Sequence, residues 1–87
     1  MSNITFSKNA WMQYQYWQMQ DKKTLKRINT LLSDIQRNGL SEGIGKPEPL
    51  KYQKEWSRRI DHANRLVYTL DNSKNIIILS CKGHYED

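Results

Sequence analysis

Residues 21–39 read DKKTLKRINTLLSDIQRNG, and this stretch carries the clearest periodic signal in the chain. Its apolar residues recur at helical spacings of three and four positions: Leu25, Ile28, Leu31, Leu32 and Ile35. This spacing places apolar side chains along one stripe of an α-helix. Asp21 is a typical N-cap residue, and Gly39 suits the position just after a helix. The stretch therefore predicts an amphipathic helix that packs one face against a core.

The segment before this helix predicts a strand and another helix. Residues 3–6 alternate between polar and apolar, as a short strand does. Ser7 is a suitable N-cap for a helix over residues 8–20. The stripe that we expect to face the core is broad, and it contains Trp11, Tyr14 and Gln18, with Ala10 and Trp17 beside them.

The second half of the chain predicts a long loop and three strands. Residues 39–55 hold five glycines and prolines, which exclude a regular element there: Gly39, Gly43, Gly45, Pro47 and Pro49. Strand-like runs follow at residues 56–60, 65–70 and 76–81, the last two joined by a turn at 71–74. The element order is therefore β-α-α-β-β-β.

This order predicts an α+β fold in which two N-terminal helices pack on one face of a largely antiparallel sheet. At 87 residues, the chain is long enough for one modest core, so we expect a single domain spanning residues 1–87. The formal net charge of +5 favours a polyanionic partner, such as nucleic acid or an acidic protein segment.

Cys81 is the only cysteine, which excludes an intrachain disulfide and favours a reducing compartment. The first ten residues lack the apolar core of a signal peptide, and the longest apolar run, 76–79, is too short to span a bilayer. We therefore expect a cytoplasmic protein. The spacing of His62, Cys81 and His84 does not match a structural zinc site, so no metal is expected.

Arginines gather on the predicted sheet. If Leu66 faces the helices, Arg65 faces the opposite side, because successive residues of a strand alternate. Arg58 and Arg59 point to opposite sides for the same reason, so one of them joins Arg65. The outer face of the sheet is therefore expected to be open and to carry two arginines.

A carboxylate and an imidazole flank this face in the sequence. Residues 45–51 read GKPEPLK and hold Glu48 rigidly between two prolines. His84 and Tyr85 follow the last predicted strand. The set suits metal-free cleavage of RNA, with Glu48 as the base for the ribose 2′-hydroxyl and His84 as the acid for the leaving oxygen. Arg59 and Arg65 would hold the phosphate, and Tyr85 would stack on a base or bind a phosphate oxygen.

These residues also have ordinary explanations. A glutamate between prolines is commonly a surface residue, strand arginines are commonly solvated or paired, and a histidine near the chain end commonly belongs to a tail. A basic RNA-binding module without catalysis is therefore an alternative from another class.

Four blocks in register give a specific resemblance. GKPEPLK at 45–51, WSRRI at 56–60, RLVY at 65–68 and HY at 84–85 resemble the YoeB (Txe) family of bacterial toxins, within the RelE/ParE superfamily. The helical segment W..Y.YWQ..DK...K.IN.L..D resembles that family too, so the likeness covers almost the whole chain.

The resemblance implies a toxin that cuts messenger RNA at the ribosomal A-site codon, with the microbial ribonuclease (RelE-like) fold and no cofactor. It implies that Glu48 is the general base, His84 the general acid and Arg65 the stabiliser of the transition state. Further contacts with phosphate or base are implied for Lys51, Arg59 and Tyr85, with Lys46 in the same motif. A ParE-like inhibitor of gyrase is the third reading, which this residue set does not favour.

The resemblance also implies partners. These are an antitoxin of the YefM type with an acidic C-terminal segment, operator DNA contacted only through that antitoxin, and a second copy of the chain. Two departures from the family pattern stand out. Gly83 replaces a common aromatic residue, which predicts a looser tail, and Glu86 and Asp87 extend the chain beyond the tyrosine.

Overall fold

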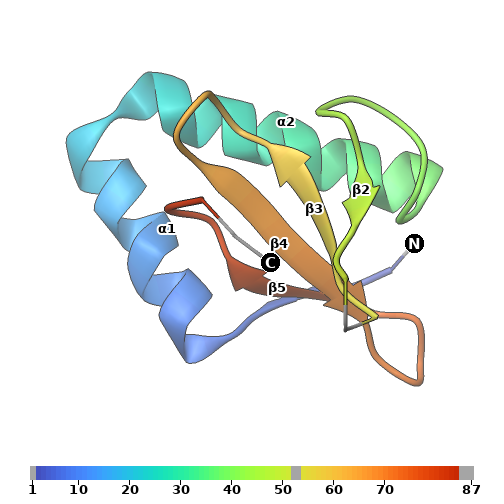
Figure 1. Cartoon of the computed structure of the whole chain (residues 1–87). Helices are drawn as coiled ribbons and strands as arrows, with labels where there is room; N and C mark the ends of the chain where they lie inside the picture. Colours follow the sequence, from blue (N-terminus) through green and yellow to red (C-terminus); the bar gives the residue numbers. More distant parts are fainter. Residues whose placement is uncertain (1, 52–53, 85–87) are drawn as a thin grey trace.

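The computed structural model describes residues 2–51 and 54–84, which form two helices and a five-stranded sheet (Figure 1). The elements, in chain order, are β1 (Ile4–Phe6), α1 (Lys8–Gln20), α2 (Lys22–Asn38), β2 (Glu48–Pro49), β3 (Trp56–Arg59), β4 (Arg65–Leu70) and β5 (Ile76–Ser80). The strand order is β1-β5-β4-β3-β2, with β1 parallel to β5 and the other pairs antiparallel. The predicted α+β class, with two N-terminal helices on a largely antiparallel sheet, is confirmed.

The starts of α1 and α2, which were predicted from the capping residues Ser7 and Asp21, are both confirmed. The Ser7 hydroxyl accepts the N–H of Ala10 at 3.1 Å at the start of α1. Asp21 ends α1 and begins α2, and its carboxylate accepts the N–H groups of Lys23 and Thr24 at 3.1 and 3.2 Å. These bonds satisfy amide donors that a helix leaves without an internal partner.

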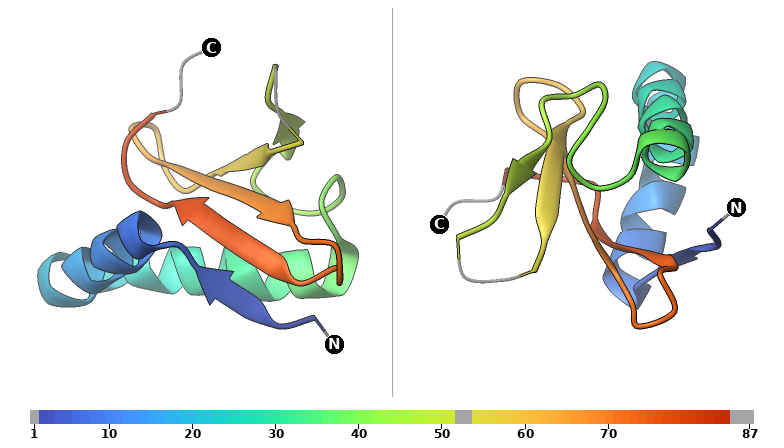
Figure 2. Two further views of the ribbon diagram at one scale, coloured as in Figure 1. Left: turned by 90° about the horizontal axis from the view of Figure 1, so that it is seen from below. Right: turned by 90° about the vertical axis from the view of Figure 1, so that its right-hand side faces the viewer.

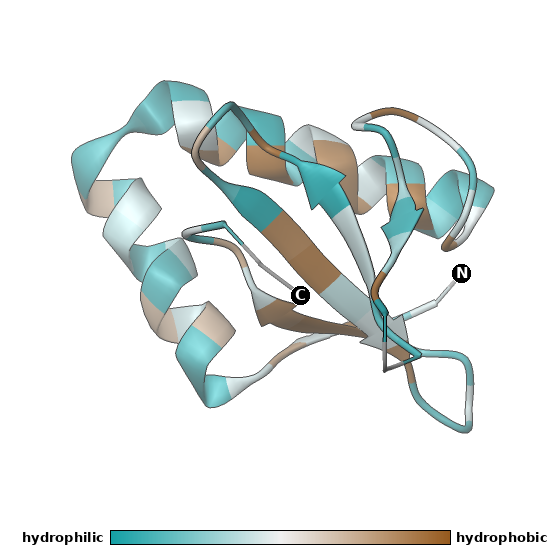
Figure 3. Ribbon diagram, in the orientation of Figure 1, coloured by the Kyte–Doolittle hydropathy of each residue, from teal (hydrophilic) through white to brown (hydrophobic). Residues whose placement is uncertain are grey.

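The core lies between the helices and the sheet, as the second view in Figure 2 makes clear. Figure 3 shows hydrophobic residues along β4, β5 and the side of α2 that faces them. The predicted stripe of α2 is buried at Ile28, Leu31, Leu32 and Ile35. Each such side chain contributes about 1.5–3 kcal/mol when fully buried, so the periodic stretch is a main source of stability.

The core-facing side of α1 differs from the prediction. Ala10 and Trp17 are buried, whereas Trp11 is 47% exposed and Gln18 is exposed. The helix is turned this way because the Trp17 indole Nε1–H donates to the Cys81 carbonyl at 2.9 Å. A buried indole requires such an acceptor.

The loop between α2 and β3 contains a regular element that the sequence did not predict. Glu48 and Pro49 form β2, which pairs with Ser57 and Trp56 of β3. The prediction of no regular element in residues 39–55 was therefore wrong at these two positions. Pro49 is compatible with β2 because this strand lies at the sheet edge, where a missing N–H is tolerated.

Arg58 is the largest fully buried side chain. Its guanidinium makes five hydrogen bonds, one with each N–H, to the Asp34 carboxylate, the Tyr68 hydroxyl and three carbonyls. The carbonyls belong to the loop after α2, at Gly39, Glu42 and Ile44. Arg58 thus fastens this loop to α2 and to the sheet.

Burial alone would raise the pKa of Asp34, but hydrogen bonds from Arg58 and from the N–H of Ile44, together with the Arg58 charge, outweigh it and hold the pKa below its ordinary value. Burial raises the pKa of Tyr68, against the opposing effect of Arg58. Cys81 is fully buried, and burial raises the pKa of its thiol to about 12.

Neither helix of the described chain is long and apolar enough to cross a membrane.

Replacing Arg58 with alanine should destabilise the protein by about 3–5 kcal/mol, because the Asp34 carboxylate and three carbonyls lose their donor. The neighbouring Arg59 is exposed, so Arg59→Ala is the matched control and should change stability by no more than about 0.5 kcal/mol. Urea denaturation of both variants measures the difference. Equal stabilities would show that the buried network is dispensable.

The Asp34 ion pair also predicts a dependence on pH. Because the pKa of Asp34 is lowered from 3.8 in the folded protein, its contribution is fully present above pH 3.8 and is lost as the pH falls through the lowered value. The stability difference between wild type and Asp34→Asn should therefore be constant near neutrality and shrink below pH 3.8. A difference that stays constant into the acid range would contradict the assignment.

Candidate functional site

Arg59 and Arg65 face each other across the β3–β4 ladder. Both lie on the sheet face away from the core, because their neighbours Arg58 and Leu66 are buried. Arg59 is exposed and Arg65 is half-buried. The prediction that one of the paired arginines joins Arg65 is confirmed, and the residue is Arg59.

Glu48 lies on the same face of the sheet, in the row of paired residues next to the row of Arg59 and Arg65. It pairs with Ser57, and Ser57 lies two residues before Arg59, so Glu48 and Arg59 are diagonal neighbours on adjacent strands. Glu48 is exposed, whereas Ser57 and Val67, its neighbours in the same row of paired residues, are buried. This face of the sheet is therefore less open than predicted.

The main-chain N–H groups of the two arginines hold the segments that carry the other candidate groups. The Arg59 N–H donates to the Gly45 carbonyl at 2.7 Å, three residues before Glu48. The Arg65 N–H donates to the Gly83 carbonyl at 2.9 Å, one residue before His84. The loop bearing the carboxylate and the segment bearing the imidazole are thus fixed to adjacent strands at the same level.

Helix α1 holds the C-terminal segment at a second point. The Cys81 N–H donates to Gln13 Oε1 at 2.6 Å, and the Cys81 carbonyl accepts the Trp17 indole N–H. Beyond this point, residues 82–84 leave the sheet on the side opposite the helices, the side on which β2 also lies (left view of Figure 2). His84 is exposed at the end of this segment.

The remaining predicted site residues are Lys46, Lys51 and Tyr85. Lys46 is exposed with a φ of 53°, and Lys51 is exposed just after β2. Tyr85, Glu86 and Asp87 lie outside the described residues. The structure brings Glu48, Arg59, Arg65 and the segment of His84 to one side of the sheet.

Two positioning contacts escaped the sequence analysis. Alternation along β3 implied that one arginine would point inward, but not that Asp34 of α2 would be its partner. The second is the Arg65 side chain, whose Nη1–H group donates to main-chain carbonyls of the preceding turn, at 2.7 Å for Asp61 and 3.1 Å for Asn64. An arginine directly after a polar turn was the only signal for this contact.

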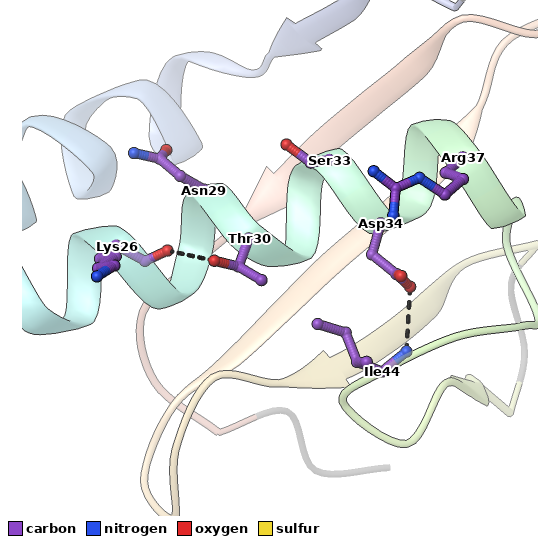
Figure 4. Close-up of a pocket in the computed structure, with 7 residues that line it drawn as sticks. All are labelled: Lys26, Asn29, Thr30, Ser33, Asp34, Arg37 and Ile44. Carbon is purple, nitrogen blue, oxygen red and sulfur yellow. Dashed lines mark hydrogen bonds between the residues drawn. The ribbon is translucent and has the colours of Figure 1, made fainter.

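A groove of about 480 Å³ lies elsewhere, along the outer side of α2 where the loop through Ile44 passes over it (Figure 4). Its lining includes Lys26 and Arg37, but none of the predicted catalytic residues. Asp34 points from α2 toward Ile44 and accepts its N–H at 3.0 Å, so this bond joins the two segments that line the groove. The groove is therefore separate from the sheet face that carries Glu48, Arg59 and Arg65.

Comparison with known protein families gives one match that spans nearly the whole chain. Residues 6–85 match the model of the YoeB-like toxin of bacterial type II toxin-antitoxin systems. The chain belongs to the YoeB toxin family. The resemblance inferred from the four sequence blocks is confirmed.

Individual YoeB relatives agree with this assignment. Toxin YoeB of a Synechocystis strain is 47% identical over 85 residues, which cover 95% of this chain and 96% of the relative. The solved structure of a YoeB dimer from Staphylococcus aureus has 56% identity and a TM-score of 0.90, with 97% of this chain and 98% of that chain covered. A YoeB–YefM complex from the same organism has 54% identity and a TM-score of 0.88, covering 98% and 99%.

Proposed function

We propose that this YoeB-family toxin is an endoribonuclease that cuts messenger RNA at the ribosomal A-site codon and so stops translation. The observation that carries the proposal is the row of Arg59 and Arg65, with the Glu48 loop and the His84 segment each bonded to the main chain of one arginine. The proposed acid, base and cations would thereby act from one side of the sheet. Metal-free cleavage of a phosphodiester requires these three kinds of group.

In the proposed step, the Glu48 carboxylate removes the proton from the ribose 2′-hydroxyl. The 2′-oxygen then forms a bond to phosphorus while the bond from phosphorus to the 5′-oxygen breaks. His84 supplies a proton to the departing 5′-oxygen. The products are a 2′,3′-cyclic phosphate and a 5′-hydroxyl end, and no electron donor or metal ion is required.

The arginines would stabilise the negative charge that builds up on the phosphate. Arg65 is suited to this role because its Nη1 group is held by turn carbonyls, so its remaining N–H groups are directed with little conformational freedom. Arg59 would bind the same phosphate from the adjacent strand. Lys46 and Lys51 would contact neighbouring phosphates, and contact of Tyr85 with the base remains a prediction.

The exposure of these groups supports dependence on the ribosome. Glu48, Arg59 and His84 are all exposed, so the protein does not enclose its substrate. Attack by the 2′-oxygen requires it to lie in line with the leaving 5′-oxygen, a geometry that free RNA seldom adopts. A ribosome that holds the codon in place would supply this geometry.

We further propose that an antitoxin of the YefM type inhibits the toxin in the cytoplasm through an acidic segment. A YefM partner in the S. aureus YoeB structure and the net charge of +5 support this. The same pair would bind operator DNA through the antitoxin. The S. aureus dimer supports pairing of two copies of this chain.

The proposal is tested with programmed ribosomes by mapping the 5′ ends of cleaved messenger RNA. Wild type should cut within the A-site codon and should not cut the same RNA without ribosomes. Glu48→Ala and His84→Ala should each lower the cleavage rate about 100-fold or more, the contribution typical of a general base or acid.

The chain offers a matched control for each variant, because Glu42 and His62 are also exposed. Glu42→Ala and His62→Ala should retain wild-type rates. If the folded wild-type protein binds ribosomes without cutting RNA, the endonuclease assignment is wrong and a non-catalytic binding module is the better account. Double-strand breaks in DNA would instead support inhibition of gyrase.

A further inference from the structure

The side chain of Asn64 joins two parts of the chain that are 19 residues apart. Its Nδ2 group donates to the Asp61 carboxylate, at 3.1 Å to Oδ1 and 3.2 Å to Oδ2. Its Oδ1 atom accepts the N–H of Gly83 at 2.8 Å. Because a carboxylate only accepts hydrogen bonds, Asp61 fixes the orientation of the amide and leaves its oxygen directed at Gly83.

Asp61 also holds the main chain of the turn. Its Oδ1 atom accepts the N–H groups of Ala63 and Asn64, both at 2.8 Å. Asn64 is therefore fixed through its main chain and its side chain by the same carboxylate. A rigid amide is suited to hold another segment in place.

Gly83 is bonded on both sides by consecutive residues of this turn. Its N–H is held by the Asn64 side chain, and its carbonyl accepts the Arg65 N–H. Its φ of +91° lies in the region that favours glycine, so the chain direction into His84 is set here. The looser tail predicted from this glycine is not what the structure shows at position 83, where both polar main-chain groups are bonded.

The same turn also holds the Arg65 guanidinium through its carbonyls, as described above. One short segment thus governs both the direction of Arg65 and the direction of the chain into His84. We propose that Asn64 is a positioning residue for RNA cleavage, which keeps the acid on the C-terminal segment aligned with Arg65. This inference rests on the proposed function.

A similar turn at the other end of the sheet provides a matched control. Asn75 donates its N–H to Asp71 Oδ1 at 2.8 Å and its Nδ2 group to Oδ2 at 3.4 Å. Its Oδ1 atom accepts the N–H of Asn3 at 3.3 Å, so it ties the N-terminal segment rather than the C-terminal one. Asn75→Ala removes the same atoms from the same kind of turn without touching residues 81–84.

The test measures kcat and KM for ribosome-dependent cleavage, together with the melting temperature. Asn64→Ala should lower kcat about tenfold, which corresponds to the loss of one hydrogen bond of typical strength in the transition state, and should leave KM within about twofold. Asn75→Ala should retain wild-type kcat. Asn64→Ala should lower the melting temperature at least as much as Asn75→Ala, because it loses three side-chain hydrogen bonds of 2.8–3.2 Å against two of 3.3–3.4 Å.

Two further variants separate positioning from folding. Asn64→Asp keeps an acceptor for Gly83 but sets a second carboxylate against Asp61, so kcat should fall. The double variant D61N/N64D exchanges the two groups and again opposes one amide to one carboxylate. It should recover most of the lost kcat, which a general loss of stability would not explain.

Hydrogen exchange of the Gly83 amide, followed by NMR, gives a readout that needs no catalysis. Exchange should be faster in Asn64→Ala and unchanged in Asn75→Ala, while the amide of Leu66 within β4 stays protected in both. If wild type cuts RNA and Asn64→Ala matches Asn75→Ala in kcat and in Gly83 exchange, the inference is wrong and the proposed function stands. If wild type does not cut, both fail, even where Gly83 exchange shows that the bond is present.

Discussion

The buried guanidinium of Arg58 is the constraint on which the rest of the structure depends. A charge removed from water must be paired and fully hydrogen-bonded, or the folded state loses several kcal/mol. The acceptors for Arg58 are the Asp34 carboxylate of α2, the Tyr68 hydroxyl of β4 and carbonyls of the loop that follows α2. Tyr68 in turn donates to the Leu40 carbonyl at 2.7 Å. A long loop that carries few apolar side chains is thereby fixed by polar contacts instead of by core packing.

The same constraint sets the direction of the neighbouring residue. Because Arg58 points into the core, Arg59 must point outward, where β-pairing sets it opposite Arg65. The loop fixed by Arg58 then continues to Gly45, whose carbonyl meets the Arg59 N–H, and on to Glu48. One arginine thus stabilises the loop and its neighbour faces the solvent beside the carboxylate that the loop delivers. Arg58 and Arg59 therefore differ in role, because successive side chains of a strand point to opposite faces of the sheet.

Much of the fold could be predicted from local signals. The apolar period of residues 21–39, the caps at Ser7 and Asp21 and the run at 65–70 each specify an element through its own residues. What failed depends on partners distant in sequence. The strand at Glu48–Pro49 exists only because β3 accepts it at the sheet edge, and α1 is turned by the bond from Trp17 to Cys81. Neither partner could be identified from the residues that lie near β2 or α1 in the sequence.

The candidate site divides in the same way. The reactive residue types and their order could be read from the sequence, and alternation predicted which face they share. The bond that holds the main chain at Gly83 could not be predicted, because its acceptor is the amide oxygen of Asn64, 19 residues away in the sequence.

Glu48 and His84 are exposed, yet each lies within three residues of a main-chain bond to Arg59 or Arg65. For Glu48 that bond is made at Gly45, and for His84 it is made at Gly83. Under the proposed function, this arrangement would let a large substrate approach while the candidate groups keep their spacing. An enclosed pocket would fix the groups equally well but would exclude the proposed substrate, a messenger RNA held on a ribosome. Rigidity supplied through the main chain, with side chains left exposed, therefore fits the proposed substrate, which another particle would present.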